Sequence, residues 1–69
     1  MEETFGERLK QLRIEKNIGQ IELAKELGVS KGVISLWENG LREPTLSNIK
    51  AIAMYFGVTS DYLIGLEKN

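Results

Sequence analysis

The stretch LAKELGVSKGVISLWENG, residues 23–40, constrains the fold of this chain more than any other segment. Two segments with helical spacing of apolar residues lie on either side of Gly28, with no linker between them. A turn as short as Gly28 to Ser30 cannot lay two helices antiparallel along their length, so the helices must cross steeply. The small side chain of Ala24 suits such a crossing. The sequence therefore predicts two short helices, at about 20–27 and 31–38, joined by a tight turn with Val29 as a buried plug.

Capping signals place a helix before this pair. Thr4 and Glu7 have the T-x-x-E spacing of a capping box, in which each side chain satisfies a free backbone N–H of the other residue. A first helix is expected from there to about Lys16, with Phe5 and Leu9 on its apolar face.

Two more helices are expected after the pair. Thr45, directly after the single proline, can cap a fourth helix that Gly57 closes, and Thr59 can cap a short fifth helix, Ser60 to Ile64, that Gly65 closes. The apolar positions of the fourth helix are Leu46, Ile49, Ile52, Ala53 and Phe56. No segment has the alternation of a strand. The predicted fold is all-α, a compact five-helix domain that spans residues 1–69 as a single unit.

The composition excludes several classes of function. The 69 residues include no cysteine and no histidine. Disulfides and the usual zinc ligand sets therefore cannot form, and the commonest general base is missing. We expect no enzymatic activity, no cofactor and no metal site.

Charge and hydropathy indicate the cellular compartment of the chain and the kinds of partner it can bind. No run approaches the roughly 20 apolar residues of a membrane span, and the N-terminus MEETFGERLK has no signal-peptide pattern. We expect a soluble cytoplasmic protein that does not bind membranes. Nine Lys and Arg against ten Asp and Glu give a net charge of −1, so any binding to a polyanion must come from a local basic face.

The second helix of the close pair has two distinct sectors. At about 100° per residue, the inward sector holds Ser30, Ile34, Trp37 and Glu38. The outward sector holds Gly32, Ser35, Leu36 and Asn39, with Lys31 at its edge. Because this outward sector is narrow and carries no negative charge, it could lie against a deep or anionic surface.

The segment from Gly19 to Gly65 resembles the phage-repressor and Cro-like helix-turn-helix family, also called XRE, which has the lambda-repressor-like fold. The resemblance rests on a combination: Gln20 at the start of the second helix, the small Ala24, the turn Gly28, apolar residues at 29, 34 and 37, and then Glu-Asn-Gly at 38–40. It extends from about Phe5 to Gly65 and so includes nearly the whole chain.

This resemblance implies that residues 31–38 form a recognition helix in the major groove of DNA while the helix at 20–27 crosses the DNA backbone. Gln20 matches a residue that bonds a phosphate or a base at the edge of the site. The matching groove-facing set is Ser30, Lys31, Gly32, Ser35 and Leu36. Asn39 and Arg42 match positions that hold the DNA backbone. Family members also pair the residue at Glu38 with an arginine of the first helix, and Arg13 stands at the matching position, which implies a structural ion pair.

Each of these residues also has an interpretation without DNA. Ser30 is a helix cap in any case, Lys31 and Arg42 could be solvated charges, and Gln20 could simply favour the first turn of a helix. Trp37 lies on the inward sector, so we expect it in the core rather than against a base. Gly32 and Leu36 depart from the Gln, Arg, Thr or Ser that relatives often place there, which leaves Lys31 as the one strong polar reader of bases.

We predict a sequence-specific double-stranded DNA-binding regulator of transcription, a repressor, that binds a palindromic operator as a homodimer. The predicted dimer surface is the C-terminal region with Tyr62, Ile64 and Leu66. The alternative is a protein-interaction module of the same fold, antitoxin-like or an anti-repressor, with little affinity for DNA. The net negative charge and the departures at Gly32 and Leu36 favour that alternative.

Overall fold

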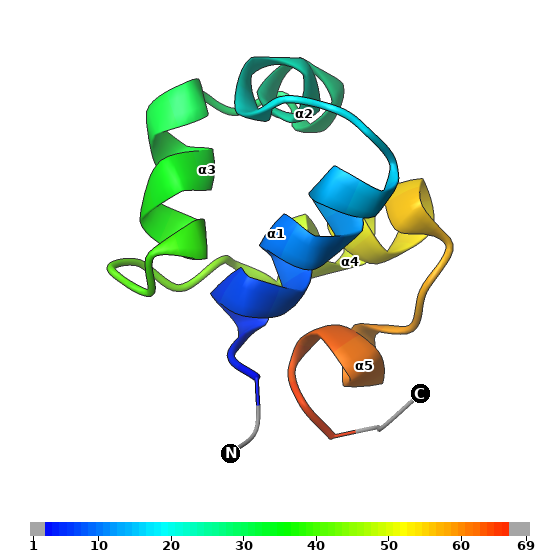
Figure 1. Cartoon of the computed structure of the whole chain (residues 1–69). Coiled ribbons are helices and arrows are strands. Elements are labelled where there is room, and N and C mark those ends of the chain that lie inside the picture. Colours follow the sequence, from blue (N-terminus) through cyan, green and yellow to red (C-terminus); the bar gives the residue numbers. More distant parts are fainter. Residues whose placement is uncertain (1–2, 67–69) are drawn as a thin grey trace.

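The computed structural model describes residues 3–66 as five helices, and no strand occurs within that range (Figure 1). The all-α prediction is therefore confirmed. The helices are α1 (Phe5–Glu15), α2 (Gln20–Leu27), α3 (Lys31–Glu38), α4 (Leu46–Phe56) and α5 (Ser60–Leu63).

Local hydrogen bonds start the helices where the sequence predicts. The Thr4 hydroxyl accepts from the backbone N–H of Glu7 at 3.1 Å, and the Glu7 carboxylate accepts from the Thr4 N–H at 2.9 Å, which completes the capping box. The hydroxyls of Ser30, Thr45 and Thr59 cap α3, α4 and α5 by accepting from the backbone N–H three residues later, where no carboxylate is present to return the bond. Gly19 precedes α2 without a side-chain cap.

The helix ends differ slightly from the predictions. Gly28 closes α2 with φ 71°, and Gly57 closes α4 with the same φ, so both adopt the left-handed conformation that glycine favours. Helix α1 ends at Glu15, one residue early, because Asn17 turns the chain with φ 61°. Asparagine tolerates this region better than other side chains do. Helix α5 ends at Leu63, so Ile64 is its C-cap rather than its last helical residue.

The core contains one side chain or more from each helix. Its buried apolar residues are Leu9, Leu23, Ala24, Ile34, Trp37, Ile52, Ala53 and Leu63. Trp37 is only 2% exposed, which confirms its predicted place in the core. Val29 packs against this core but is half-buried rather than buried, because the turn lies at the surface. Leu46 is 75% exposed, since its position on α4 is about 120° away from that of Ile52.

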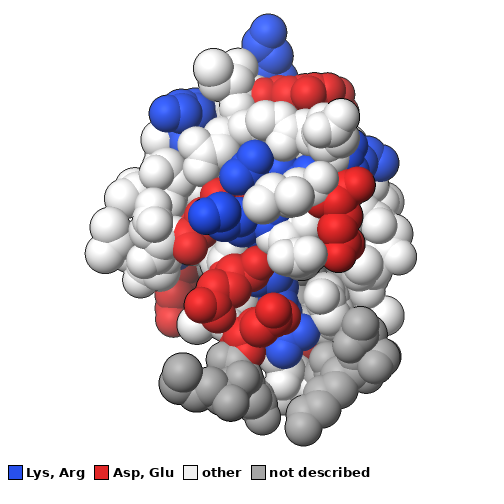
Figure 2. Space-filling model, in the orientation of Figure 1, with Lys and Arg blue, Asp and Glu red and all other residues white. Residues whose placement is uncertain are grey.

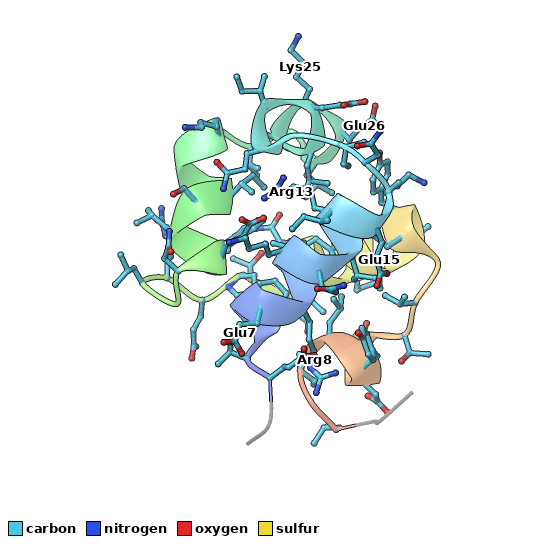
Figure 3. The ribbon with its side chains drawn as sticks, in the orientation of Figure 1. Glu7, Arg8, Arg13, Glu15, Lys25 and Glu26 are labelled. Atoms are coloured by element: carbon cyan, nitrogen blue, oxygen red, sulfur yellow. The ribbon has the colours of Figure 1, made fainter. Side chains whose placement is uncertain are left out.

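The α2–α3 pair and α5 lie at opposite ends of the molecule (Figure 1). Helix α5 is only four residues long. A cation–π contact joins it to α1, because the Arg8 guanidinium carbon lies 4.8 Å from the centre of the Tyr62 ring. Arg8 is 7% exposed and lies beside α5 in Figure 3. Among the helices at residues 3–66, none combines the length and the hydropathy that a bilayer crossing requires.

Candidate nucleic-acid interface

The turn between α2 and α3 is held by backbone and side-chain hydrogen bonds. The Val29 N–H donates to the Ala24 carbonyl at 3.0 Å, and the Ser30 hydroxyl accepts from the Val33 N–H at 3.2 Å. With Gly28 in the left-handed conformation, α3 starts shortly after the turn begins. Because Ala24 is only 4% exposed at this crossing, the two helices are in close contact and α3 has a fixed orientation.

Helix α3 presents one sector to the core and another to solvent. Ile34 is fully buried on the inner sector. On the outer sector Lys31 and Gly32 are exposed, Ser35 is half-buried and Leu36 is 36% exposed. The structure thus places the sequence-predicted groove-facing residues along one edge. Ser30 is exposed as well, although the helical angles assign it to the inner sector, because it precedes the first helical turn.

Gly32 has no steric role within the folded chain. A Cβ atom added at this position would meet nothing nearer than the Ser30 hydroxyl at 3.7 Å, and the φ of Gly32 lies in the ordinary helical range. A glycine at a helical position is destabilising by roughly 0.5–1 kcal/mol relative to alanine. The fold therefore gives no steric reason for glycine at this position.

The Glu38 side chain, at the C-terminal end of α3, links α3 to α1 and α2. Its Oε2 lies 2.7 Å from Arg13 Nε, and its Oε1 accepts from Arg13 Nη2 at 3.2 Å and from Gln20 Nε2 at 3.0 Å. The two side chains of the ion pair are 13% and 4% exposed for Arg13 and Glu38 respectively. Arg13 Nη1 also donates to the Ile18 carbonyl at 3.1 Å. Figure 3 shows Arg13 pointing from α1 toward the junction of α2 and α3.

This network changes how Gln20 can act. One of its two amide N–H groups is taken up by Glu38, so the side chain has a fixed direction at the start of α2. The other N–H and the amide oxygen remain for an external partner. Sequence reasoning treated Gln20 and Glu38 separately, because no local pattern indicates that two residues 18 positions apart share a hydrogen bond.

The loop after α3 contributes Arg42, whose side chain is exposed. A shallow hollow beside it is lined by Val33, Trp37, Glu43, Thr45 and Asn48, so the loop lies beside one flank of α3 and the start of α4, with the acidic Glu43 next to Arg42. Asn39, by contrast, faces back toward its own helix: its Nδ2 donates to the Ser35 carbonyl at 2.9 Å. Arg42 and Asn39 are therefore not equivalent, although the sequence grouped them.

A protein-family model for the helix-turn-helix matches residues 9–63. This chain belongs to the helix-turn-helix family. The match includes all of α2, the turn and α3, which confirms the resemblance to phage repressors that the sequence indicates. The family consists of regulators of transcription and not of enzymes.

Relatives of this helix-turn-helix chain include an activator and a repressor. The HTH-type transcriptional activator BcrR of Enterococcus faecalis is 44% identical over 64 residues, 93% of this chain and 31% of the activator. The cryptic phage CTXphi transcriptional repressor RstR of Vibrio cholerae is 32% identical over 54 residues, 78% of this chain and 49% of the repressor. The chain therefore spans about a third to a half of these relatives.

Among solved structures, the P22 c2 repressor in complex with a synthetic operator is similar, with a TM-score of 0.88 and 34% identity. The superposition includes 94% of this chain and 98% of that one. This likeness confirms the lambda-repressor-like arrangement of the five helices.

Glu22 and Glu26 of α2 lie away from the outer sector of α3. Partial burial of the ring, together with the carboxylates of Glu26 and Glu22, raises the pKa of Tyr55 near the end of α4. Figure 3 shows Glu26 on the side of α2 that faces the end of α4, opposite α3. In Figure 2 the surface over α3, at the left edge, is largely uncharged, with basic atoms at its upper end. The net charge of −1 is therefore unevenly distributed.

Gly6, in the first turn of α1, supports the position of α3 in a way that the sequence did not predict. A Cβ atom at this position would lie 2.6 Å from the Glu38 carbonyl oxygen and closer still to that of Trp37. The backbone of α1 therefore touches the last carbonyls of α3 directly. The one available signal was a glycine inside the first turn of a well-capped helix, where alanine and most other residues favour the helix more than glycine does.

Proposed function

We propose that this chain is a sequence-specific double-stranded DNA-binding domain of a transcriptional regulator, with α3 in the major groove. The observation that carries the proposal is the outer sector of α3. It includes the small residues Gly32 and Ser35, contains no acidic side chain, and lies over a core that fixes its orientation. The P22 c2 repressor and SinR, both solved in complex with DNA, share this arrangement of helices with TM-scores of 0.88 and 0.80. Relatives include an activator as well as repressors, so the proposal extends to regulation in either direction.

The roles proposed for the site residues follow from their placement. Lys31 and Ser30, at the N-terminal end of α3, reach a base edge or a phosphate, and Leu36 contacts a thymine methyl group, the apolar feature of the major groove. Gly32 permits close approach of the DNA. Gln20, held by Glu38, and Arg42, on the loop, contact the DNA backbone on either side of α3.

A second copy of the chain is proposed to complete the DNA-binding unit. Ile64 and Leu66 are 48% and 75% exposed at the end of the molecule that lies away from α2. Tyr62, which the sequence grouped with them, is half-buried with its ring under Arg8 and offers less contact area. A homodimer through this face would bind a palindromic operator with half-sites about 34 Å apart. Because the chain is proposed to regulate transcription, we place it in the cytoplasm.

Binding to duplex DNA is expected to weaken steeply with added salt. A handful of phosphate contacts per dimer would give a slope of log K against log salt of several units, because each contact releases counterions. Arg42→Ala should weaken binding to all sequences about equally and lower the slope by about one unit for each phosphate that the arginine neutralises. The measurement is a titration of fluorescent duplexes, selected from a random pool, at several salt concentrations. Absence of binding to selected and random duplexes at low salt would favour the interaction module instead.

Gly32→Ala is expected to change stability and DNA binding in opposite directions. The folded chain should gain roughly 0.5–1 kcal/mol, because alanine favours the helix and its Cβ meets no obstacle. Affinity for the selected operator should fall by about tenfold, the equivalent of one good contact. Chemical denaturation and operator titration of the same preparation test both. An unchanged operator affinity would show that DNA does not approach α3 at Gly32.

A further inference from the structure

Ser35 and Asn39, one helical turn apart on the outer sector of α3, are joined by hydrogen bonds. Asn39 Nδ2 donates to the Ser35 carbonyl at 2.9 Å and lies 3.4 Å from the Ser35 hydroxyl oxygen. The Asn39 backbone N–H donates to the same carbonyl at 3.0 Å. Asn39 therefore caps the end of α3, and its amide nitrogen faces both oxygen atoms of Ser35.

The contact between Asn39 Nδ2 and the Ser35 hydroxyl determines which of the two groups donates the hydrogen. An amide nitrogen donates but cannot accept, so the Ser35 hydroxyl oxygen is the acceptor of the Asn39 contact. A serine within a helix commonly turns its hydroxyl back to the carbonyl four residues earlier, here that of Lys31. Within residues 3–66, no such bond to Lys31 is present, and Asn39 is the one hydrogen-bond partner of the hydroxyl. The hydroxyl hydrogen of Ser35 is consequently available to an external acceptor.

We infer that Asn39 is a positioning residue, which occupies one lone pair of the Ser35 hydroxyl and so favours donation of its hydrogen to an acceptor on a base edge. This inference rests on the proposed DNA binding of α3. A serine hydroxyl that rotates freely can serve donors and acceptors alike and distinguishes bases poorly. As a donor, Ser35 favours guanine O6 or N7, adenine N7 or thymine O4, and disfavours cytosine, whose major-groove edge presents only the amino donor.

The same geometry argues against a direct contact between Asn39 and the DNA backbone. With its nitrogen turned toward Ser35, the side chain leaves its amide oxygen as the outward polar atom. An oxygen acceptor gains nothing from a phosphate, which carries acceptors only. Asn39 thus acts on DNA through Ser35, in contrast to Arg42, whose charge acts on phosphates directly.

Asn39→Asp is the decisive variant. A carboxylate has no hydrogen to donate, so it loses the bond to the Ser35 carbonyl, turns one oxygen toward the Ser35 hydroxyl, accepts its hydrogen and leaves a serine lone pair facing the base. At one position of each half-site, the discrimination against cytosine should be lost or reversed, by about three- to tenfold, the range of one net hydrogen bond. The added negative charge should weaken every sequence by one common factor. Asn39→Ala should flatten the preference at the same position without reversing it.

The experiment titrates a panel of single-base variants of the selected operator with the full chain and with each variant. Ser35→Ala, alone and combined with Asn39→Asp, completes a double-mutant cycle, and Arg42→Ala is the control for a phosphate contact. Thermal melts followed by circular dichroism identify variants in which the helix cap is disrupted, and these variants are left out of the comparison. Asn39→Ser then replaces them as the milder substitution. We expect the Asn39 variants to change no base preference once Ser35 is alanine.

Two outcomes would overturn the inference. If Asn39→Asp and Asn39→Ala weaken all operator variants equally, as Arg42→Ala should, Asn39 contacts the backbone itself. If they change base preference in the Ser35→Ala background too, Asn39 reads a base without the hydroxyl. A wild-type chain that binds no selected duplex overturns the proposed function together with this inference, which distinguishes that failure from the other two.

Discussion

Replacing Gly6 by alanine is expected to lower the free energy of unfolding by about 3 kcal/mol, the upper end for overpacking a well-packed contact. The added methyl group would overlap the carbonyl oxygens of Trp37 and Glu38, which are backbone atoms and cannot rotate away. For a domain of this size the melting temperature should fall by roughly 12–24 °C. The measurement is thermal and urea denaturation followed by circular dichroism.

Gly32→Ala is the matched control, because it adds the same methyl group to a helical glycine in open space. The comparison isolates the steric cost from the general effect of alanine on helix stability. If Gly6→Ala proves as stable as wild type, α1 and α3 do not approach as closely as described. The destabilised variant should also bind operator DNA more weakly than its folded fraction explains, since the end of α3 would be displaced.

Arg13→Ala is expected to be the most damaging substitution of a charged residue, at about 3–5 kcal/mol. The variant would leave the Glu38 carboxylate, 4% exposed, with only the Gln20 amide as a partner, and the Ile18 carbonyl would lose its side-chain donor. A domain of 69 residues has little more stability than this to lose. Denaturation midpoints of the purified variant would provide the measurement.

Lys10→Ala is the comparison for this prediction, because Lys10 lies on the same helix with an exposed side chain. An exposed lysine without such contacts should change stability by less than about 0.5 kcal/mol. Equal midpoints for the Lys10 and Arg13 variants would contradict a stabilising role for the ion pair. Such a result would mean that the pair contributes no more to the free energy of unfolding than a solvent-exposed ion pair, under about 1 kcal/mol.

Features of the fold that depend on neighbouring residues could be predicted from the sequence. The capping box of Thr4 and Glu7, the cap at Ser30 and the left-handed turn at Gly28 each involve residues within a few positions of one another. Helical periodicity likewise separated the buried Trp37 from the exposed edge of α3. These signals are local, so a single sequence contains them completely.

Features that depend on packing between helices could not be predicted in the same way. The contact of Gly6 with the end of α3 involves two segments more than 30 residues apart, and a glycine gives no sign of what it touches. The hydrogen bond from Gln20 to Glu38 depends on how α2 and α3 cross. The Asn39 contact with Ser35 is local, but whether a side chain turns back on its own helix or toward solvent depends on its rotamer.

The division of α3 into a buried and an outer sector has a consequence for how the proposed DNA-binding surface can diversify. Lys31 and Gly32 are exposed and a Cβ at Gly32 meets open space, so substitutions there can change operator preference with little loss of stability. Gln20 is different, because its amide shares a carboxylate with the ion pair that stabilises the chain. Mutational drift should therefore be rapid along the outer edge of α3 and slow at the start of α2.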